Sequence, residues 1–124
     1  QGELVRSIYL SLACKYKVVL ERLEAASGRD VRTIHVIGGG ARNELLCQLT
    51  ADVSGRDVLA GPVEATALGN VLVQARAAGA LHGDLTALRA VLRETQQIVR
   101  YEPGGDPASW VAAESAVEAA RTGR

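Results

Sequence analysis

Three consecutive glycines, Gly38 to Gly40, are the residues of this sequence best suited to binding a ligand. They directly follow a short β-branched run, Thr33 to Ile37, and a helical pattern begins at about Arg42. Glycine leaves no Cβ between the backbone and a ligand, and it can adopt positive φ angles. A helix that starts here points unpaired N–H groups into the same space. The spacing predicts a strand, a turn and a helix that hold a phosphate, a ribose or a base edge; a tight turn without a ligand is the alternative.

Neither of two familiar phosphate-binding motifs fits this turn. A dinucleotide-binding turn has the pattern G-x-G-x-x-G and a carboxylate at the end of the next strand. Here Asn43 stands in place of the third glycine, and the next strand ends in Val58-Leu59-Ala60. A Walker loop requires G-K-[ST], which does not follow the glycines. A dinucleotide-dependent oxidoreductase half-domain is therefore disfavoured, although it stays an alternative.

The other polar residues do not form a catalytic arrangement. Asp52 lies late in a helix, where we expect it to cap the helix or pair with an arginine, and Glu64 opens a helix, where the dipole favours a negative charge. His35 lies in mid-strand and is expected to be a satisfied core histidine, whereas His82 is expected in a solvated loop. We therefore predict no catalytic residue and no metal-binding residue in this chain.

Charge and cysteine content exclude several classes of protein. The formal net charge is zero, so nothing favours nucleic acid or an acidic membrane as a partner. Cys14 and Cys47 are far apart and lie in apolar helical segments, unlike the clustered ligands of a metal site or the cysteines of a secreted disulfide scaffold. We expect two buried thiols in a cytoplasmic protein.

The glycine turn has to be positioned by helices packed on a small parallel sheet. Hydrophobic periodicity predicts helices over residues 3–27, 42–54, 64–79 and 85–93 and a last helix opened by Pro107, with strands over 33–37 and 57–60 and a brief extended piece over 98–101. The two strands should be parallel and joined by a right-handed crossover. A parallel sheet normally has more strands and is covered on both faces. Because the chain also begins with Gln1 and contains no methionine, we expect a fragment of a longer protein.

Several motifs in register give a more specific interpretation. The motifs are G-G-x-x-x-N, then Q-x-x-A-D, then G, then E-x-T-A-L-G, carried by Gly39, Gly40, Asn43, Gln48, Ala51, Asp52, Gly55, Glu64, Thr66, Ala67, Leu68 and Gly69. The run from Ile34 to Ala75 that contains them resembles the adenosine-binding segment of FGGY carbohydrate kinases. The closing version AGPVEATALGN, from Ala60 to Asn70, is similar to the rhamnulokinase branch of that family.

The resemblance implies an α/β fold, a helix-rich fragment of an actin/hexokinase-like (ribonuclease H-like) ATPase domain with two short parallel strands. Residues 1–124 would be the carboxy-terminal part of the second kinase domain, with an adenosine-binding segment over 33–79 and a helical tail over 84–121. The adenosine moiety of ATP would pack against Gly39, with Gly40 beside it. Asn43, one turn into the helix, would offer its side-chain amide to the nucleotide. Gly38 would shape the turn.

The resemblance also implies an activity for the parent enzyme. It would transfer the γ-phosphoryl of ATP to the 1-hydroxyl of L-rhamnulose, with Mg²⁺ screening the phosphates. The catalytic base, the sugar pocket and the phosphate-gripping loops would lie upstream of these residues, so this chain alone should be inactive. A kinase for another sugar or polyol, and a non-catalytic actin-like regulatory domain, remain the alternatives.

Overall fold

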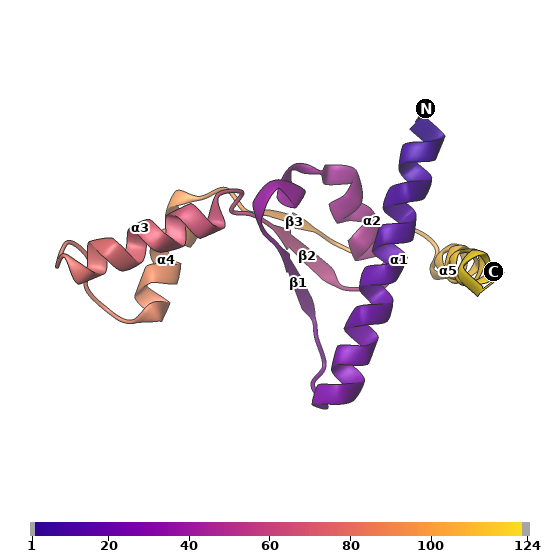
Figure 1. The fold of residues 1–124 in the computed structure, drawn as a ribbon, viewed down its shortest axis with the longest axis horizontal. Helices are drawn as coiled ribbons and strands as arrows, with labels where there is room; N and C mark the ends of the chain where they lie inside the picture. Colours follow the sequence, from indigo (N-terminus) through magenta and orange to yellow (C-terminus); the bar gives the residue numbers. More distant parts are fainter. Residues whose placement is uncertain (1, 123–124) are drawn as a thin grey trace.

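The computed structural model describes residues 2–122. In chain order the elements are α1 (Gly2–Ser27), β1 (Thr33–Val36), the 3₁₀ helix η1 (Gly38–Arg42), α2 (Glu44–Ser54), β2 (Asp57–Ala60), α3 (Ala65–Ala77), α4 (Leu85–Thr95), β3 (Val99–Tyr101) and α5 (Pro107–Thr122). Helices α1, α2 and α5 lie to one side of a small sheet, and α3 and α4 project from its other end (Figure 1). The predicted α/β class and its helix-rich character are therefore confirmed.

The sheet has three strands in the order β1-β2-β3. As predicted, β1 and β2 are parallel, in a register that pairs His35 with Leu59. The expectation of two strands was one short, because β3 pairs antiparallel with β2 and places Val99 opposite Ala60. The sheet is therefore mixed. The central strand β2 carries Val58, whose side chain is fully buried.

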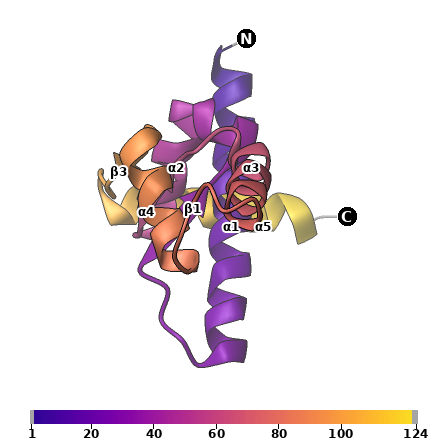
Figure 2. The same ribbon diagram turned by 90° about the vertical axis from the view of Figure 1, so that its left-hand side faces the viewer.

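Helix α2 forms the centre of the packing because both of its sides are covered. One core cluster joins it to α1 through Cys14, Leu49 and Val53, with Trp110 and Val117 of α5 at its margin. The other cluster joins α2 to the sheet and is formed by Cys47, Ala51, Val58 and Ala60. Both thiols are buried, as predicted. Helix α5 lies across α1, since it is seen almost end-on in Figure 1 and from the side in Figure 2.

A charged cluster fixes the carboxy-terminal end of α1. The Arg56 guanidinium donates to both carboxylate oxygens of Glu24 at 2.9 and 2.7 Å, and its Nε donates to the Val31 carbonyl at 2.6 Å. The Val31 N–H in turn donates to Glu24 at 2.8 Å. These contacts hold the loop between α1 and β1 against the turn before β2, so they set the position of β1.

Two residues of the Q-x-x-A-D motif hold a loop instead of a ligand. The Asp52 carboxylate accepts hydrogen bonds from Gln48 Nε2 and from the Gly104 N–H, both at 2.8 Å. Gln48 Nε2 also donates to the Glu102 carbonyl at 2.9 Å. The expectation that Asp52 caps its helix or pairs with an arginine was wrong, because the chain after β3 returns to α2 and supplies a backbone partner.

Helices α3 and α4, with the loop between them, form an arm that projects away from the sheet (Figure 1). Asp84 caps the start of α4, and its carboxylate accepts hydrogen bonds from the N–H groups of Thr86 and Ala87, both at 3.0 Å. A Cβ built at Gly69 of α3 meets no atom within 4 Å in residues 2–122, so no neighbouring element packs closely against the helix at this point.

One surface of the body is apolar and open. Strand β1 pairs only with β2 among the described residues. Helix α1 exposes apolar side chains, of which Leu23 lines a groove with β1 and Ile8 lies nearer the amino terminus. His35 on β1 is exposed, so its interpretation as a core histidine was wrong for this chain; its strand lies at the sheet edge. His82 is exposed, as predicted. None of the helices within residues 2–122 has the length and hydrophobicity needed to cross a membrane.

Candidate functional site

The glycine turn lies at the carboxyl end of β1 and forms a short 3₁₀ helix. Gly38 has a φ angle of 77°, in the left-handed region that side chains disfavour, so the prediction that this residue shapes the turn is confirmed. The turn does not lead straight into an α-helix. The helix begins at Glu44 instead of about Arg42, because residues 38–42 close tighter i→i+3 contacts first.

The backbone conformation of Gly39 and Gly40 does not require glycine. Neither Gly39 nor Gly40 has a positive φ, and both are exposed. A Cβ built at Gly39 meets nothing within 4 Å, and one at Gly40 meets only Val36 Cγ1 at an ordinary 3.6 Å. The described chain therefore tolerates side chains at both positions, and their absence leaves the outer surface of the turn clear.

Asn43 lies at the amino-terminal cap of α2, and not one turn into the helix as expected. Its Oδ1 accepts from the Leu46 N–H at 3.0 Å, which is the usual capping contact. An amide side chain carries two donors on its nitrogen as well. The oxygen is therefore occupied by the helix, and the NH₂ group is the part of Asn43 that is suited to a ligand.

Two loops meet at this edge of the sheet. The Gly61 N–H donates to the Val36 carbonyl at 2.8 Å, and the Gly38 N–H donates to the Pro62 carbonyl at 3.2 Å. Helix α3 begins just beyond, and Glu64 occupies its amino-terminal cap position, as predicted, without a side-chain capping bond. Ligands of open α/β sheets bind outside the carboxyl ends of the strands. The glycine turn occupies that position in this fold.

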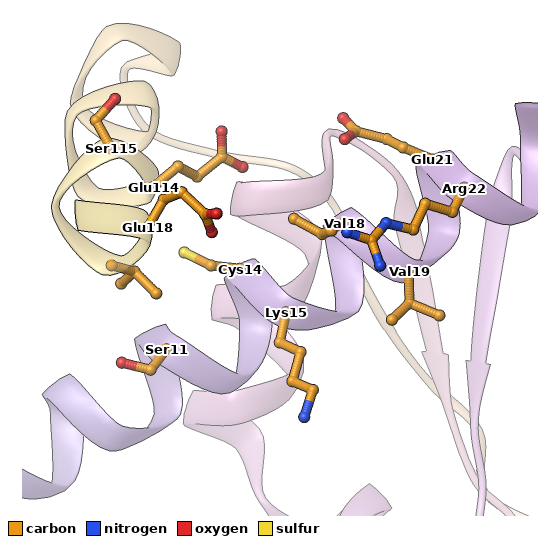
Figure 3. Close-up of a pocket in the computed structure, with 11 residues that line it drawn as sticks. Ser11, Cys14, Lys15, Val18, Val19, Glu21, Arg22, Glu114, Ser115 and Glu118 are labelled. Atoms are coloured by element: carbon orange, nitrogen blue, oxygen red, sulfur yellow. The ribbon is translucent and has the colours of Figure 1, made fainter. Parts of the chain in front are cut away.

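Of two cavities in the described part of the chain, one borders the glycine turn and the other lies away from it. An apolar groove of about 770 Å³ runs between α1, β1 and α2, and Gly40 and Cys47 both line it. A second cavity of about 750 Å³ lies between α1 and α5 (Figure 3). Gly39 and Asn43 line neither of them. Of the three predicted site residues, only Gly40 therefore borders one of these two cavities.

The cavity between α1 and α5 contains the second thiol. Figure 3 shows Cys14 between the carboxylates of α5 and the charged side chains of α1. Glu114 is bound by Lys17 Nζ at 2.8 Å, so this carboxylate joins the two helices. Burial, and secondarily the charge of Glu114, raises the pKa of the Cys14 thiol. Such a thiol is protonated and unreactive at neutral pH, which agrees with a packing role.

No metal centre is formed by the part of the chain that the structure describes. Within residues 2–122 no three side chains of His, Cys, Asp or Glu come together in a way that could hold a metal ion. The residues present thus do not fit a Mg²⁺ site of their own.

The match to a family model shows to which protein family the chain belongs. The model of the carboxy-terminal domain of the FGGY family of carbohydrate kinases matches residues 1–78, which include α1, the glycine turn, α2 and α3. The chain belongs to the FGGY family of carbohydrate kinases. The FGGY carboxy-terminal domain is of the actin/hexokinase-like type, so the predicted fold family is confirmed together with the predicted resemblance.

Curated relatives extend the FGGY similarity beyond residue 78. The rhamnulokinase of Bacteroides thetaiotaomicron is 47% identical over 113 residues, covering 91% of this chain and 23% of that protein. The rhamnulokinase of Bacillus subtilis is 45% identical over 102 residues, which cover 82% of this chain and 21% of that protein. The rhamnulokinase of Enterococcus faecalis is 51% identical over 94 residues, which cover 74% of this chain and 19% of that protein. The chain spans about a fifth of the length of these relatives.

Sequence reasoning missed two residues that support the FGGY glycine turn. Cys47 lies beneath it and contacts the Gly40 carbonyl. Gly61 has a φ angle of 122°, and a Cβ there would lie 2.7 Å from the Gln97 carbonyl. The predicted strand over 57–60 implied a change of direction after Ala60, but nothing in the sequence indicated that the turn there would form hydrogen bonds with the glycine turn. No sequence signal marked Cys47 except its position two helical turns after Gly40.

Proposed function

We propose that this chain is the ATP-binding carboxy-terminal portion of a sugar kinase that converts L-rhamnulose to L-rhamnulose 1-phosphate. Membership of the FGGY family supports a carbohydrate kinase. The names of the relatives support the sugar, since proteins called rhamnulokinase match up to 91% of the chain. The parent enzyme would work in the cytoplasm on ATP, with a sugar bound by the part of the enzyme upstream of this chain.

The observation that carries the nucleotide assignment is the bare outer surface of the glycine turn. Adenosine would pack against Gly39, where a Cβ would meet open space in the chain itself, with Gly40 beside it. The NH₂ group of Asn43 would donate to the nucleotide while its oxygen caps α2. A ligand that occupies this surface gives a reason for two glycines that the described fold does not require.

The chemistry of transfer would depend on residues outside this chain. Mg²⁺ would accompany the phosphates of ATP and screen their charge. Since the described residues offer no metal site, it would be held by the nucleotide and by upstream groups. The role of this chain would be to bind and orient the adenosine, which places the γ-phosphoryl group relative to the sugar.

Gly39→Val in the complete enzyme tests the nucleotide site. The branched side chain would occupy the space assigned to adenosine, so we expect the KM for ATP to rise at least tenfold while the KM for L-rhamnulose stays unchanged. Ala116→Val on the exposed surface of α5 is a matched control that adds bulk elsewhere. A KM for ATP within about twofold of wild type would mean that the glycines serve the turn alone.

A substrate panel tests the sugar and the remaining alternatives. The complete enzyme should phosphorylate L-rhamnulose with a higher kcat/KM than other ketoses or polyols, as measured by coupled ADP release. A higher value for another sugar would reassign the substrate within the family. ATP binding without turnover on any sugar would instead favour a non-catalytic regulatory domain.

A further inference from the structure

The underside of the glycine turn is fixed by contacts to the Gly40 carbonyl. The oxygen accepts from the Asn43 N–H at 3.1 Å and from the Cys47 Sγ at 3.7 Å, within the range for a thiol donor. The Cys47 N–H donates back to the Asn43 carbonyl at 3.0 Å. Gly40, Asn43 and Cys47 thus form a closed set of hydrogen bonds that joins the glycine turn to the cap and the first turn of α2.

The direction of this carbonyl matters for the opposite surface of the turn. Oriented backbone dipoles act as fixed partial charges. With its oxygen held toward α2, Gly40 keeps a partial negative charge away from the exposed side. Glycine has unusual conformational freedom, so the peptide that follows Gly40 gains from contacts that select one orientation of its carbonyl. An outward carbonyl would instead extend into the surface proposed for the adenosine.

Cys47 is suited to provide this contact. Its side chain is only 1% exposed and is packed with Ala51, Val58 and Ala60 in the cluster between α2 and the sheet. Burial raises the pKa of the thiol, so the sulfur keeps its proton and can donate at neutral pH. Gly40 and Cys47 both line the apolar groove. Packing therefore leaves room for the turn to shift on that side.

We propose that Cys47 is a positioning residue for nucleotide binding, which acts by holding the Gly40 carbonyl toward α2. The inference rests on the proposed function, since it assumes that the nucleotide binds on the outer surface of the turn. Cys47 itself does not touch the nucleotide. Its effect is to keep one conformation of the turn populated before ATP arrives, which lowers the cost of binding.

Substitutions at Cys47 in the complete enzyme test this role. Cys47→Ala removes the donor, and Cys47→Val removes it while filling much of the space. Both should raise the KM for ATP about threefold, toward the lower end of what one hydrogen bond contributes, because a thiol is a weak donor. The KM for the sugar and the kcat at saturating ATP should not change. Cys47→Ser keeps a donor and should return the KM for ATP to within about twofold of wild type.

Cys14 provides the matched control because it is the other buried thiol, 3% exposed, in the cluster between α1 and α2. Cys14→Ala creates a similar cavity far from the turn. It should lower the melting temperature about as much as Cys47→Ala without changing the KM for ATP. Equal KM values for the two alanine variants would overturn the proposal. So would a KM for Cys47→Ser as high as that for Cys47→Ala, since the donor would then be irrelevant.

Two further comparisons keep the outcome decisive. If Cys47→Ala does not fold, Cys47→Val against Cys47→Ser supplies the same contrast between a missing and a retained donor. Gly39→Val separates the inference from the proposed function. A raised KM for ATP in Gly39→Val together with a normal KM in the Cys47 variants would reject the positioning role alone. Normal values in both would reject the nucleotide site, and the positioning role with it.

Discussion

Alanine substitutions at two adjacent glycines should change the stability of the chain in opposite directions. Gly38 has a φ angle of 77°, and Gly39 has no positive φ. A side chain in the left-handed region costs about 1–2 kcal/mol. At Gly39 a methyl group meets nothing within 4 Å, so the main effect of alanine is on the unfolded chain. Gly→Ala at a compatible position stabilises by about 0.4–1 kcal/mol. The free energies of unfolding of the two variants should therefore differ by about 1.5–3 kcal/mol.

Thermal unfolding of the chain, followed by circular dichroism at a concentration where sedimentation shows one species, measures this difference. At roughly 4 °C per kcal/mol, the two melting temperatures should be separated by about 6–12 °C, with wild type between them. If adenosine binds at Gly39 as proposed, kinetics of the complete enzyme should give a different order, with Gly39→Ala raising the KM for ATP although it stabilises the fold. If both alanines lower the melting temperature equally, the conformational distinction between Gly38 and Gly39 is refuted.

Three further predictions concern the charged cluster, the open apolar surface and the activity of the isolated chain. The Val31 N–H, and then Arg56, hold the pKa of Glu24 below its usual range, so the stability that this carboxylate adds is present above about pH 4.3 and is lost as the pH falls through the lower folded pKa. In Glu24→Gln, the midpoint of urea unfolding should lose this part of its dependence on acid pH, and an unchanged dependence would contradict the assignment. The isolated chain should self-associate or melt with poor cooperativity, because the edge of β1 and the apolar face of α1 are open. Ile8→Glu should shift its sedimentation toward the monomer. A monodisperse wild-type monomer with a sharp unfolding transition above about 60 °C would show that this surface needs no partner. The isolated chain should release no ADP from ATP and L-rhamnulose in a coupled assay, and turnover above a contaminant control would place the catalytic groups within it.

Local signals in the sequence were sufficient for most helices and for the parallel strands. The β-branched run before the glycines predicted β1, and hydrophobic periodicity predicted α4, whose start is fixed locally because the Asp84 carboxylate accepts from two N–H groups of its first turn. Gly38 was correctly assigned to the shape of the turn, since glycine is the residue that most readily adopts the positive φ angle found there. All of these features depend on residues close together in the chain.

The features that sequence reasoning missed depend on residues that are distant in the chain. The pairing of β3 with β2 joins segments separated by the whole α3–α4 arm, and no local pattern marks it. The partner of Asp52 is the Gly104 N–H, which could not be found before the return path of the chain was known. Asn43 became a cap because residues 38–42 form a 3₁₀ helix, a choice that the sequence alone does not distinguish from an early start of α2.

The antiparallel register of β2 and β3 means that the two strands constitute a β-hairpin, and the α3–α4 arm is its loop. The arm leaves the sheet after Ala60 and returns at Val99, which are paired residues. Its two ends touch where Gly61 approaches the Gln97 carbonyl. An insertion, a deletion or a complete exchange of the arm would therefore leave the strand register unchanged. Only the base of the arm is tied to the glycine turn, through the hydrogen bonds from Gly61 to Val36 and from Gly38 to Pro62, so the size and surface of its distal part can vary while these contacts are kept.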